Sequence, residues 1–330
     1  MEHSVFRRKL DKNKIQPPEL MSTYTEKIIS DIKMIDVDYY VEFINLDTSI
    51  ENFEKFGMSY SYAKNNSGVF LNPRPNKDTL RNFYINSNSR SFWLKNILKE
   101  TQKKRVDEII LPHLNWVKEI MSQYYNKDLT TLEIIEFNPV HWLYLDNINN
   151  FFNTNYSFYD LFFPVDKIPS PIKNFEIVNE LETHKYDCCF LFESIDRALN
   201  PVALLSSVLN ALKVNGICFI SCLLSSGFEA KSLGKASNVF FPPEKMNLFS
   251  YEGIIKLINE NECFEIIEFS TPSLLDLENV LTNLQDVEGR SFISYMLDER
   301  NDEYIKNKFK DFLQENRLGS SARIAIKKVK

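Results

Sequence analysis

A long stretch without glycine constrains this chain more than any other feature. No glycine occurs between Gly68 and Gly216. Within that stretch, residues 132–142 (LEIIEFNPVHW) have the pattern of a buried strand, a turn and a helix, which is how a nucleotide-binding α/β domain begins. The turn in such domains normally contains glycines, because the backbone must bend sharply and approach the ligand without intervening side chains. The sequence therefore predicts an α/β domain that lacks the residues on which its usual ligand would rest.

Composition excludes several classes of protein. The chain has 330 residues, of which 44% are hydrophobic, so it is long enough and apolar enough for two globular domains. Its net charge of −6 gives no basic field that would attract nucleic acid, and we interpret the run Lys103-Lys104-Arg105 as a solvated surface. The sequence shows no signal peptide and no apolar segment near the roughly 20 residues that span a membrane. We expect a cytoplasmic protein with neither nucleic acid nor membrane as a partner.

The cysteines are also consistent with a cytoplasmic protein. Most of them lie in apolar segments typical of buried strands, so we interpret them as reduced, buried thiols. No pair has the spacing of a metal-binding CxxC with a nearby histidine, and we expect no metal site. The five cysteines are Cys188, Cys189, Cys218, Cys222 and Cys263.

The pattern along the chain divides it into three parts. Residues 1–20 are polar and end in Gln16-Pro17-Pro18, which is typical of a flexible arm. We assign residues 21–125 to an N-terminal accessory domain with connecting helices, one of them a long helix over 91–123 that Pro112 should kink or divide. Residues 126–330 form the α/β domain.

In the α/β part, strand and helix signals alternate, which is typical of a mostly parallel sheet. Asn138 and Pro139 fit the N-cap and first position of a helix that would run to about residue 152, and Asn200-Pro201 repeats that signal. The expected strands cover residues 132–137, 156–163, 175–178, 186–192, 217–224, 264–269 and 322–328, and further helices are expected over 250–261 and 276–316.

Several segments, in a fixed order, carry a resemblance to a known family. They are residues 70–75 (FLNPRP) with Phe83-Tyr84, residues 186–201, residues 242–250 (PPEKMNLFS) and residues 312–318 (FLQENRL). In these segments the chain resembles bacterial class I S-adenosylmethionine (SAM)-dependent methyltransferases, in the branch with a small, often zinc-binding domain before the catalytic core. The resemblance implies a Rossmann-like class I methyltransferase fold, with a seven-stranded, mostly parallel sheet and helices on both faces. It also implies a small N-terminal α+β accessory domain.

Four signature features of that family are missing. The turn has no glycine, the histidines of a Glu-His pair and of a Pro-Pro-x-His segment are replaced, and the zinc-binding cysteine pairs are absent. The residues at these places are Lys64, Ser67, Phe137, Asn138, Asp196, Arg197 and Lys245. We expect the Phe137 side chain to occupy space that the cofactor's amino-acid part requires, and we expect no zinc.

The candidate pocket lies at the carboxyl ends of the predicted strands, where open α/β sheets bind ligands. In a SAM enzyme the acid after the second strand would hold the ribose hydroxyls, a role open to Asp160 or Asp166. Asn138 also fits a plain helix N-cap, and Glu193 and Asp196 also fit solvated loop carboxylates or caps of the helix at Asn200. By analogy with the fold, the cofactor-binding positions are Glu136, Phe137, Asn138, Asp160, Glu180 and Glu193.

The sequence assigns no catalytic residue with certainty, and its candidates are Asp196, Arg197 and Lys245. Arg197 and Lys245 are too basic to act as a general base unless strongly perturbed, but they could bind a phosphate or a carboxylate. We interpret His141 as a packed or surface side chain rather than a base. Three residues fit either a wall of the cleft between domains or structural packing: Tyr84, Arg90 and Trp93.

Two functions fit this pattern. The missing features favour a non-catalytic or repurposed homologue that has lost normal SAM binding and has no cofactor. Such a protein would bind a protein partner, such as an active methyltransferase homologue, or an altered small-molecule ligand. The alternative is an active but divergent methyltransferase, with SAM as cofactor, acting on a small molecule such as a modified or nucleotide-linked sugar.

Overall fold

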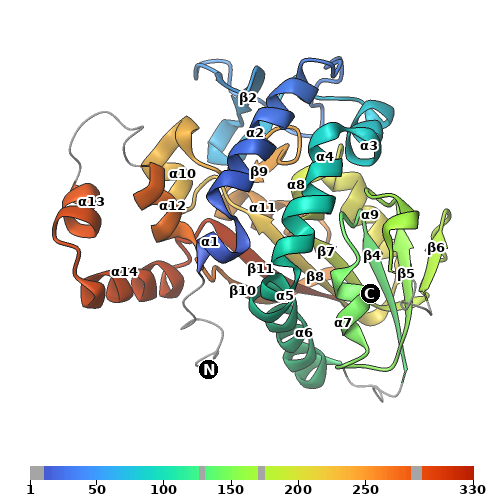
Figure 1. Cartoon of the computed structure of the whole chain (residues 1–330). Helices are drawn as coiled ribbons and strands as arrows, with labels where there is room; N and C mark the ends of the chain where they lie inside the picture. Colours follow the sequence, from blue (N-terminus) through green and yellow to red (C-terminus); the bar gives the residue numbers. More distant parts are fainter. Residues whose placement is uncertain (1–10, 126–130, 170–174, 284–291) are drawn as a thin grey trace.

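The computed structural model describes residues 11–125, 131–169, 175–283 and 292–330 (Figure 1). Its larger sheet has seven strands in the order β10-β11-β8-β7-β4-β5-β6. Neighbouring strands run parallel except where β11 pairs with β10 and β8. The strands are β4 (Leu132–Phe137), β5 (Thr154–Tyr159), β6 (Phe175–Val178), β7 (Tyr186–Phe192), β8 (Leu212–Leu223), β10 (Phe264–Ser270) and β11 (Ser321–Lys328). This order, with one antiparallel strand beside the edge, confirms the predicted Rossmann-like class I methyltransferase fold.

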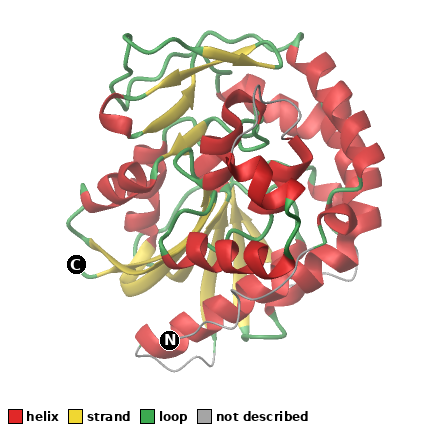
Figure 2. Ribbon diagram, turned by 90° about the vertical axis from the view of Figure 1, so that its left-hand side faces the viewer, coloured by secondary structure: helices red, strands yellow, loops and turns green. Residues whose placement is uncertain are grey.

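Helices cover both faces of this sheet (Figure 2). The side chains of β4 alternate between the faces, so Ile134 packs in one hydrophobic cluster while Ile135 and Phe137 pack in the other. Every residue of β7 is buried, as expected of a central strand covered on both sides. The covering helices include α6 (Leu111–Tyr124) and α7 (Leu143–Ile148) on the first face, and α9 (Pro201–Ala211) and α11 (Tyr251–Asn259) on the second.

A smaller antiparallel sheet forms the accessory part, with the strand order β1-β2-β3-β9. Its strands are β1 (Phe53–Lys55), β2 (Met58–Tyr62), β3 (Gly68–Leu71) and β9 (Asn247–Phe249). The last strand comes from the far half of the chain, so the accessory sheet is built into the α/β part rather than joined to it by a linker alone. The division of the chain near residue 125 stays a prediction, because residues 126–130 lie outside the described residues.

A helical run leads from the accessory part to the larger sheet. Its α-helical segments α4, α5 and α6 are separated by two π-helical turns, and the second turn ends just before α6. Pro112 lies in the first turn of α6, where a residue without an N–H is tolerated. The α-helical pattern is therefore interrupted close to the predicted break. The bounds are α3 (Lys77–Asn86), α4 (Asn88–Phe92), Trp93–Leu98, α5 (Lys99–Arg105) and Val106–Ile110.

The predicted arm at the N-terminus differs from the structure. From Asp11 onward the chain is helical, with α1 (Lys12–Ile15) followed by α2 (Pro18–Ile32). Asp11 caps α1 by accepting a hydrogen bond from the N–H of Asn13, and the two prolines suit the start of α2. Ile15 is only 2% exposed, so α1 is packed against the molecule. Residues 1–10 lie outside the described residues.

Other boundaries follow the sequence with local shifts. Asn200 caps α9 as predicted, because its side chain accepts a hydrogen bond from the N–H of Ala203 at 3.0 Å. Strand β5 begins two residues before its predicted start and ends at Tyr159. Strand β8 begins at Leu212 and includes Asn215, whose positive φ of 68° is accommodated within the strand. The stretch predicted as helical over 276–316 contains α12 (Asp276–Asn283), α13 (Phe292–Ser294) and α14 (Glu303–Glu315), and residues 284–291 lie outside the description.

Within the described parts of the chain, no helix is long and apolar enough to cross a membrane.

Gly253 marks the closest approach between α11 and the accessory part. A Cβ added there would lie 1.9 Å from the carbonyl oxygen of Ser67, in the loop before β3. That carbonyl also accepts a hydrogen bond from the N–H of Ser250 at 3.0 Å, so the loop cannot move aside without losing it. We expect Gly253→Ala to lower the free energy of unfolding by about 2 kcal/mol or more, despite the higher helix propensity of alanine.

Urea unfolding measures this effect. Glu252→Ala, at an exposed position on the same helix, is the matched control and should change the free energy of unfolding little. Equal stability of the two variants would contradict the close approach.

Candidate functional site

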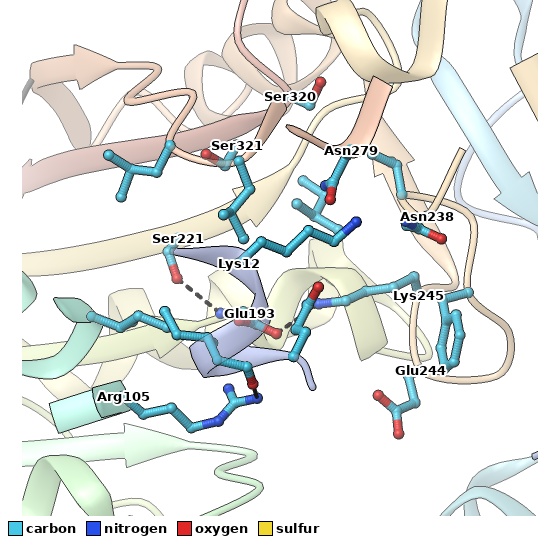
Figure 3. Close-up of a pocket in the computed structure, with 18 of the residues that line it drawn as sticks. Lys12, Arg105, Glu193, Ser221, Asn238, Glu244, Lys245, Asn279, Ser320 and Ser321 are labelled. Atoms are coloured by element: carbon cyan, nitrogen blue, oxygen red, sulfur yellow. Dashed lines mark hydrogen bonds and ion pairs between the residues drawn. The ribbon is translucent and has the colours of Figure 1, made fainter. Parts of the chain in front are cut away.

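A cavity of about 650 Å³ lies at the carboxyl ends of β4, β7 and β8 (Figure 3). Glu136 at the end of β4, Glu193 after β7 and Ser221 in β8 line it from the sheet. Helix α1 contributes Lys12, and α5 contributes Arg105. This is the edge of the sheet at which open α/β folds bind ligands.

The cavity occupies only one side of the point where the strand order reverses. Strand β4 lies between β7 and β5, but no described residue directly after β5 or β6 lines the cavity. Instead, Asp160 after β5 pairs with Lys77 (Nζ–Oδ2 3.7 Å) and Arg81 (Nη1–Oδ1 3.3 Å) from α3. Beside them the rings of Tyr84 and Phe162 stack, with centroids 4.8 Å apart. Helix α3 therefore closes the β5–β6 side of the crevice.

The turn after β4 keeps a glycine-like conformation without glycine. Asn138 has a positive φ of 50°, a region that asparagine enters more readily than most residues. Its N–H donates to the carbonyl of Tyr159, and its carbonyl accepts from Nη1 of Arg197 at 3.4 Å. The predicted N-cap role of Asn138 is wrong, because α7 begins only at Leu143 and Trp142 holds the cap position.

The structure also corrects the expectation for Phe137. Its side chain is fully buried and packs against the ring of Tyr159, with centroids 5.4 Å apart, on the face opposite to Glu136. The alternation of side chains along a strand is the reason, since Glu136 and Phe137 must point to opposite faces. Phe137 is not among the residues that line the cavity, so it does not fill the site.

Three predicted catalytic candidates and Glu193 meet in one buried charge network. Nζ of Lys245 lies 2.7 Å from Glu193 Oε2 and 3.0 Å from Asp196 Oδ2, and Arg197 Nη2 lies 3.5 Å from Glu193 Oε2. Asp196 and Arg197 lie in helix α8 (Ser194–Arg197), which follows directly after β7. The N–H of Leu223 in β8 also donates to Asp196. The network therefore joins the ends of two central strands to the loop that carries Lys245.

The charges in this network have defined states at neutral pH. Lys245 and Arg197 hold the pKa of Glu193 well below its ordinary value. Burial raises the pKa of Asp196 to about 6, against the attraction of Lys245. Burial alone would lower the pKa of Lys245, but Glu193 and Asp196 raise it above its ordinary value. The side chain of Glu193 is 57% exposed, and because Glu193 lines the cavity, that surface faces its lumen.

A second network closes the cavity from the accessory side. Glu244 accepts a short hydrogen bond from the hydroxyl of Tyr24 and pairs with Nη1 of Arg90 at 3.3 Å. Arg90 Nη2 donates to the carbonyl of Val140 at 3.2 Å, and its guanidinium lies 4.6 Å from the ring centroid of Trp93. Two buried arginines, Arg90 and Arg197, thus donate hydrogen bonds to carbonyl groups of the turn after β4.

Neutral titratable groups line the floor of the cavity. Burial raises the pKa of Glu136 to about 8, although the hydroxyl of Tyr156 donates to its Oε2 at 2.6 Å. Burial lowers the pKa of His141 to about 3 and that of His113 well below its usual range. His141 stacks on Trp93, as a packed side chain should. At neutral pH these groups are uncharged, so the cavity floor carries no charge from them.

The predicted pocket positions therefore fall into two sets. Glu136 and Glu193 line the cavity, whereas Asp160 is held by α3. Glu180 is exposed and does not line the cavity. Asp166, the second candidate for the ribose hydroxyls, pairs with its neighbour Lys167 at 2.5 Å and also lies outside.

Sequence reasoning missed several residues that line the cavity, namely Lys12, Tyr24, Arg105, Glu229 and Glu244. The sequence held a signal for Arg105, because it lies four residues before Ile109 and helical periodicity places both on one face. Its place in a basic run suggested a solvated surface instead. Tyr24 and Glu229 gave no signal, since only the fold brings them to this cavity.

In the described parts of the chain, no group of three or more His, Cys, Asp or Glu side chains is arranged to hold a metal ion.

Comparison with known proteins adds structural likeness only. No family model matches the sequence, and no curated protein matches it. Among solved structures, a chain from the complex between the Haloferax volcanii Trm112 methyltransferase activator and a methyltransferase described as putative has a TM-score of 0.45 at 11% identity, covering 72% of this chain and 96% of the other. Geranyl diphosphate C-methyltransferase from Streptomyces coelicolor A3(2) has a TM-score of 0.43 at 11% identity, covering 70% and 84%. At these values the likenesses carry no argument about activity, and the strand order alone defines the fold.

Removing the cation of the first network should be costly. Lys245→Met leaves Asp196 buried with no other described cation within ion-pair distance, and breaking a buried ion pair typically costs about 3–5 kcal/mol. We expect a loss of up to that size in the free energy of unfolding at pH 8. Without the attraction of Lys245, burial raises the pKa of Asp196 further, so the variant must either keep an unpaired buried carboxylate or take up a proton.

A double-mutant cycle tests the interpretation. The variant Lys245→Met with Asp196→Asn should recover part of the loss, because the uncompensated charge is gone. A double variant as unstable as the sum of the single variants would contradict a direct interaction.

Glu136 should make the protein less stable as the pH rises. Its folded pKa of about 8 lies above its ordinary value of 4.5, so its stabilising contribution is complete below pH 4.5 and is lost as the pH rises through 8. That shift corresponds to at most about 4–5 kcal/mol. We expect Glu136→Gln to flatten this loss and to be more stable than the wild type at pH 9.

Chemical unfolding between pH 5 and pH 9 measures the effect. Glu133→Gln, on the same strand but partly exposed, is the control and should follow the wild-type pH profile. Parallel profiles for the wild type and Glu136→Gln would show that Glu136 is not protonated in the folded protein.

Proposed function

We propose that this protein is a repurposed member of the class I methyltransferase fold that binds a small molecule in the open half of its crevice. In this proposal the protein does not bind SAM in the way that is usual for proteins of this fold. The observation that carries the proposal is the closure of the β5–β6 side by Lys77, Arg81 and Asp160, while the β7–β8 side stays open.

The residues present fit SAM poorly. An acid after the second strand of such a sheet would have to accept the ribose hydroxyls, but Asp160 is already paired with two cations and only 17% of its side chain is exposed. The stack of Tyr84 on Phe162 occupies the neighbouring space. In the turn itself, the carbonyls of Asn138 and Val140 are bound to buried guanidinium groups, which would repel a sulfonium. No methyl-transfer step is therefore derived for this chain.

An altered ligand has better support than a protein partner. A homologue kept only to bind a partner has no need of an open crevice, and side chains would be expected to fill it. The cavity of about 650 Å³ is instead within the range of small-molecule sites and combines aromatic walls with a few polar groups.

Calorimetric titration tests the proposal. We expect neither SAM nor its demethylated product to give a binding signal at about 1 mM, a concentration that would reveal any interaction stronger than roughly −4 kcal/mol. The double variant Lys77→Ala with Arg81→Ala frees Asp160 and serves as the matched comparison. Weak SAM binding gained only in that variant would support the closed crevice.

The competing function is an active, divergent SAM-dependent methyltransferase. The observation in its favour is that Glu136 and Glu193 reach the open half, where carboxyl groups could meet a cationic cofactor. Submillimolar binding of SAM by the wild-type protein, or transfer of a labelled methyl group to any small acceptor, would establish it and overturn the proposal.

A further inference from the structure

The cavity wall around Trp93 holds an uneven set of charges. Three of its cations have carboxylate partners: Arg90 pairs with Glu244, and Arg197 and Lys245 pair with Glu193, Lys245 also with Asp196. The fourth cation, Arg105, is different, since no described carboxylate lies within ion-pair distance of its guanidinium group. The four cations are Arg90, Arg105, Arg197 and Lys245, and the carboxylates that pair with three of them are Glu193, Asp196 and Glu244.

Arg105 is that fourth cation. Its Nη2 donates to the carbonyl of Ile15 at 2.9 Å and its Nε donates to Thr101 Oγ1 at 2.8 Å, and both acceptors are neutral. Its guanidinium lies 5.4 Å from the ring centroid of Trp93. Burial lowers its pKa to about 10, which still leaves it charged at neutral pH. The carboxylate of Glu193 attracts Arg105 over a longer distance, but no described carboxylate forms an ion pair with it, so the described residues leave its ion-pair position open.

Two neighbouring arginines offer further unused donors. Nε of Arg90 and Nε of Arg197 are buried and have no hydrogen-bond partner among the described residues, and both residues line the cavity. Both side chains are nearly inaccessible, at 2% exposure. Arg90 lies over the same Trp93 ring as Arg105. Buried polar atoms are rarely left unpaired, and a bound water or a ligand group is what usually satisfies such atoms.

The rest of this wall is aromatic. Tyr144 and Phe192 line the cavity with ring centroids 4.4 Å apart, and the neutral imidazoles of His113 and His141 flank them. A ligand that brings a negative group to Arg105 would therefore meet flat, uncharged side chains with the remainder of its surface.

We propose that this wall is a binding subsite for an oxyanion, the carboxylate or phosphate of a small ligand whose body is largely apolar. Arg105 supplies a cation that forms no ion pair with a described carboxylate, and guanidinium groups suit the geometry of both oxyanions. The inference rests on the proposed function, because it takes the open half of the crevice to hold a ligand other than SAM.

Calorimetry with three probes on the purified full chain tests the subsite. Benzoate and phenyl phosphate present the two oxyanions on the same ring, and benzamide is the uncharged analogue. We expect at least one anion to bind, and benzamide to bind at least tenfold more weakly. The ratio of the two anion affinities shows whether the subsite prefers a carboxylate or a phosphate.

Substitutions at Arg105 locate the site. Arg105→Gln should weaken the preferred anion at least tenfold, Arg105→Lys should retain part of the affinity, and Lys104→Gln, at an exposed position on the same helix, should change nothing. Thermal unfolding of each variant distinguishes weaker ligand binding from loss of the folded structure. Arg105→Lys keeps the test valid if Arg105→Gln does not fold.

Three results would overturn the subsite: binding of benzamide as tight as that of the preferred anion, no binding of either anion at about 10 mM, or wild-type affinity of the preferred anion in Arg105→Gln. Failure here differs from failure of the proposed function. If SAM binds and benzoate competes with it, the proposed function fails while the oxyanion subsite stands. If SAM and both anions all fail to bind, the subsite fails alone.

Discussion

The ammonium group of Lys245 is the interaction on which the arrangement of the site depends. It neutralises Glu193 and Asp196 at the end of β7, and Asp196 in turn accepts the N–H of Leu223 at the end of β8. The carbonyl of Lys245 accepts the hydroxyl of Tyr60 from the accessory sheet at 2.6 Å. One residue therefore holds two central strands and the accessory sheet together, and β9 follows directly after it as the last strand of that sheet. Because charges buried at this depth are costly when unpaired, the network fixes these parts in one relative position.

That fixed position gives the crevice two unequal halves. On the β5–β6 side, α3 brings two cations to Asp160 and the stack of Tyr84 on Phe162 fills the space beside them. On the other side, α1 and α5 cover the cavity without filling it. The same sheet edge that accommodates a nucleoside-bearing cofactor in other proteins of this fold class thus presents a closed half and an open half here.

The sequence predicted the sheet well and the site only in part. Buried strands such as residues 186–192 and the capped helix after Asn200 have strong local signals, so their bounds agree closely with the structure. The turn after β4 was harder, because Asn138 has two roles open to it and only the surrounding hydrogen bonds select the left-handed one. The expected obstruction by Phe137 failed for a simple reason, since the sequence register fixes which face a strand residue occupies and Phe137 faces the core.

Contacts between distant segments explain the remaining misses. The sequence marked Asp196, Arg197 and Lys245 as replaced positions, and the structure brings them together. The sequence gave no sign that Glu193 would join them through an ion pair with Lys245. The ion pairs of Asp160 are formed with side chains of α3 that lie about 80 residues away in the sequence, and no local sequence pattern predicts such a pairing. The closed half should stay closed when the cofactor of the fold is offered. A crystal structure determined with several millimolar demethylated SAM measures this directly. We predict that Lys77 and Arg81 remain on Asp160 and that no adenosine density lies over β5 and β6, whereas an ordered adenosine at that edge, with α3 displaced, would contradict the account.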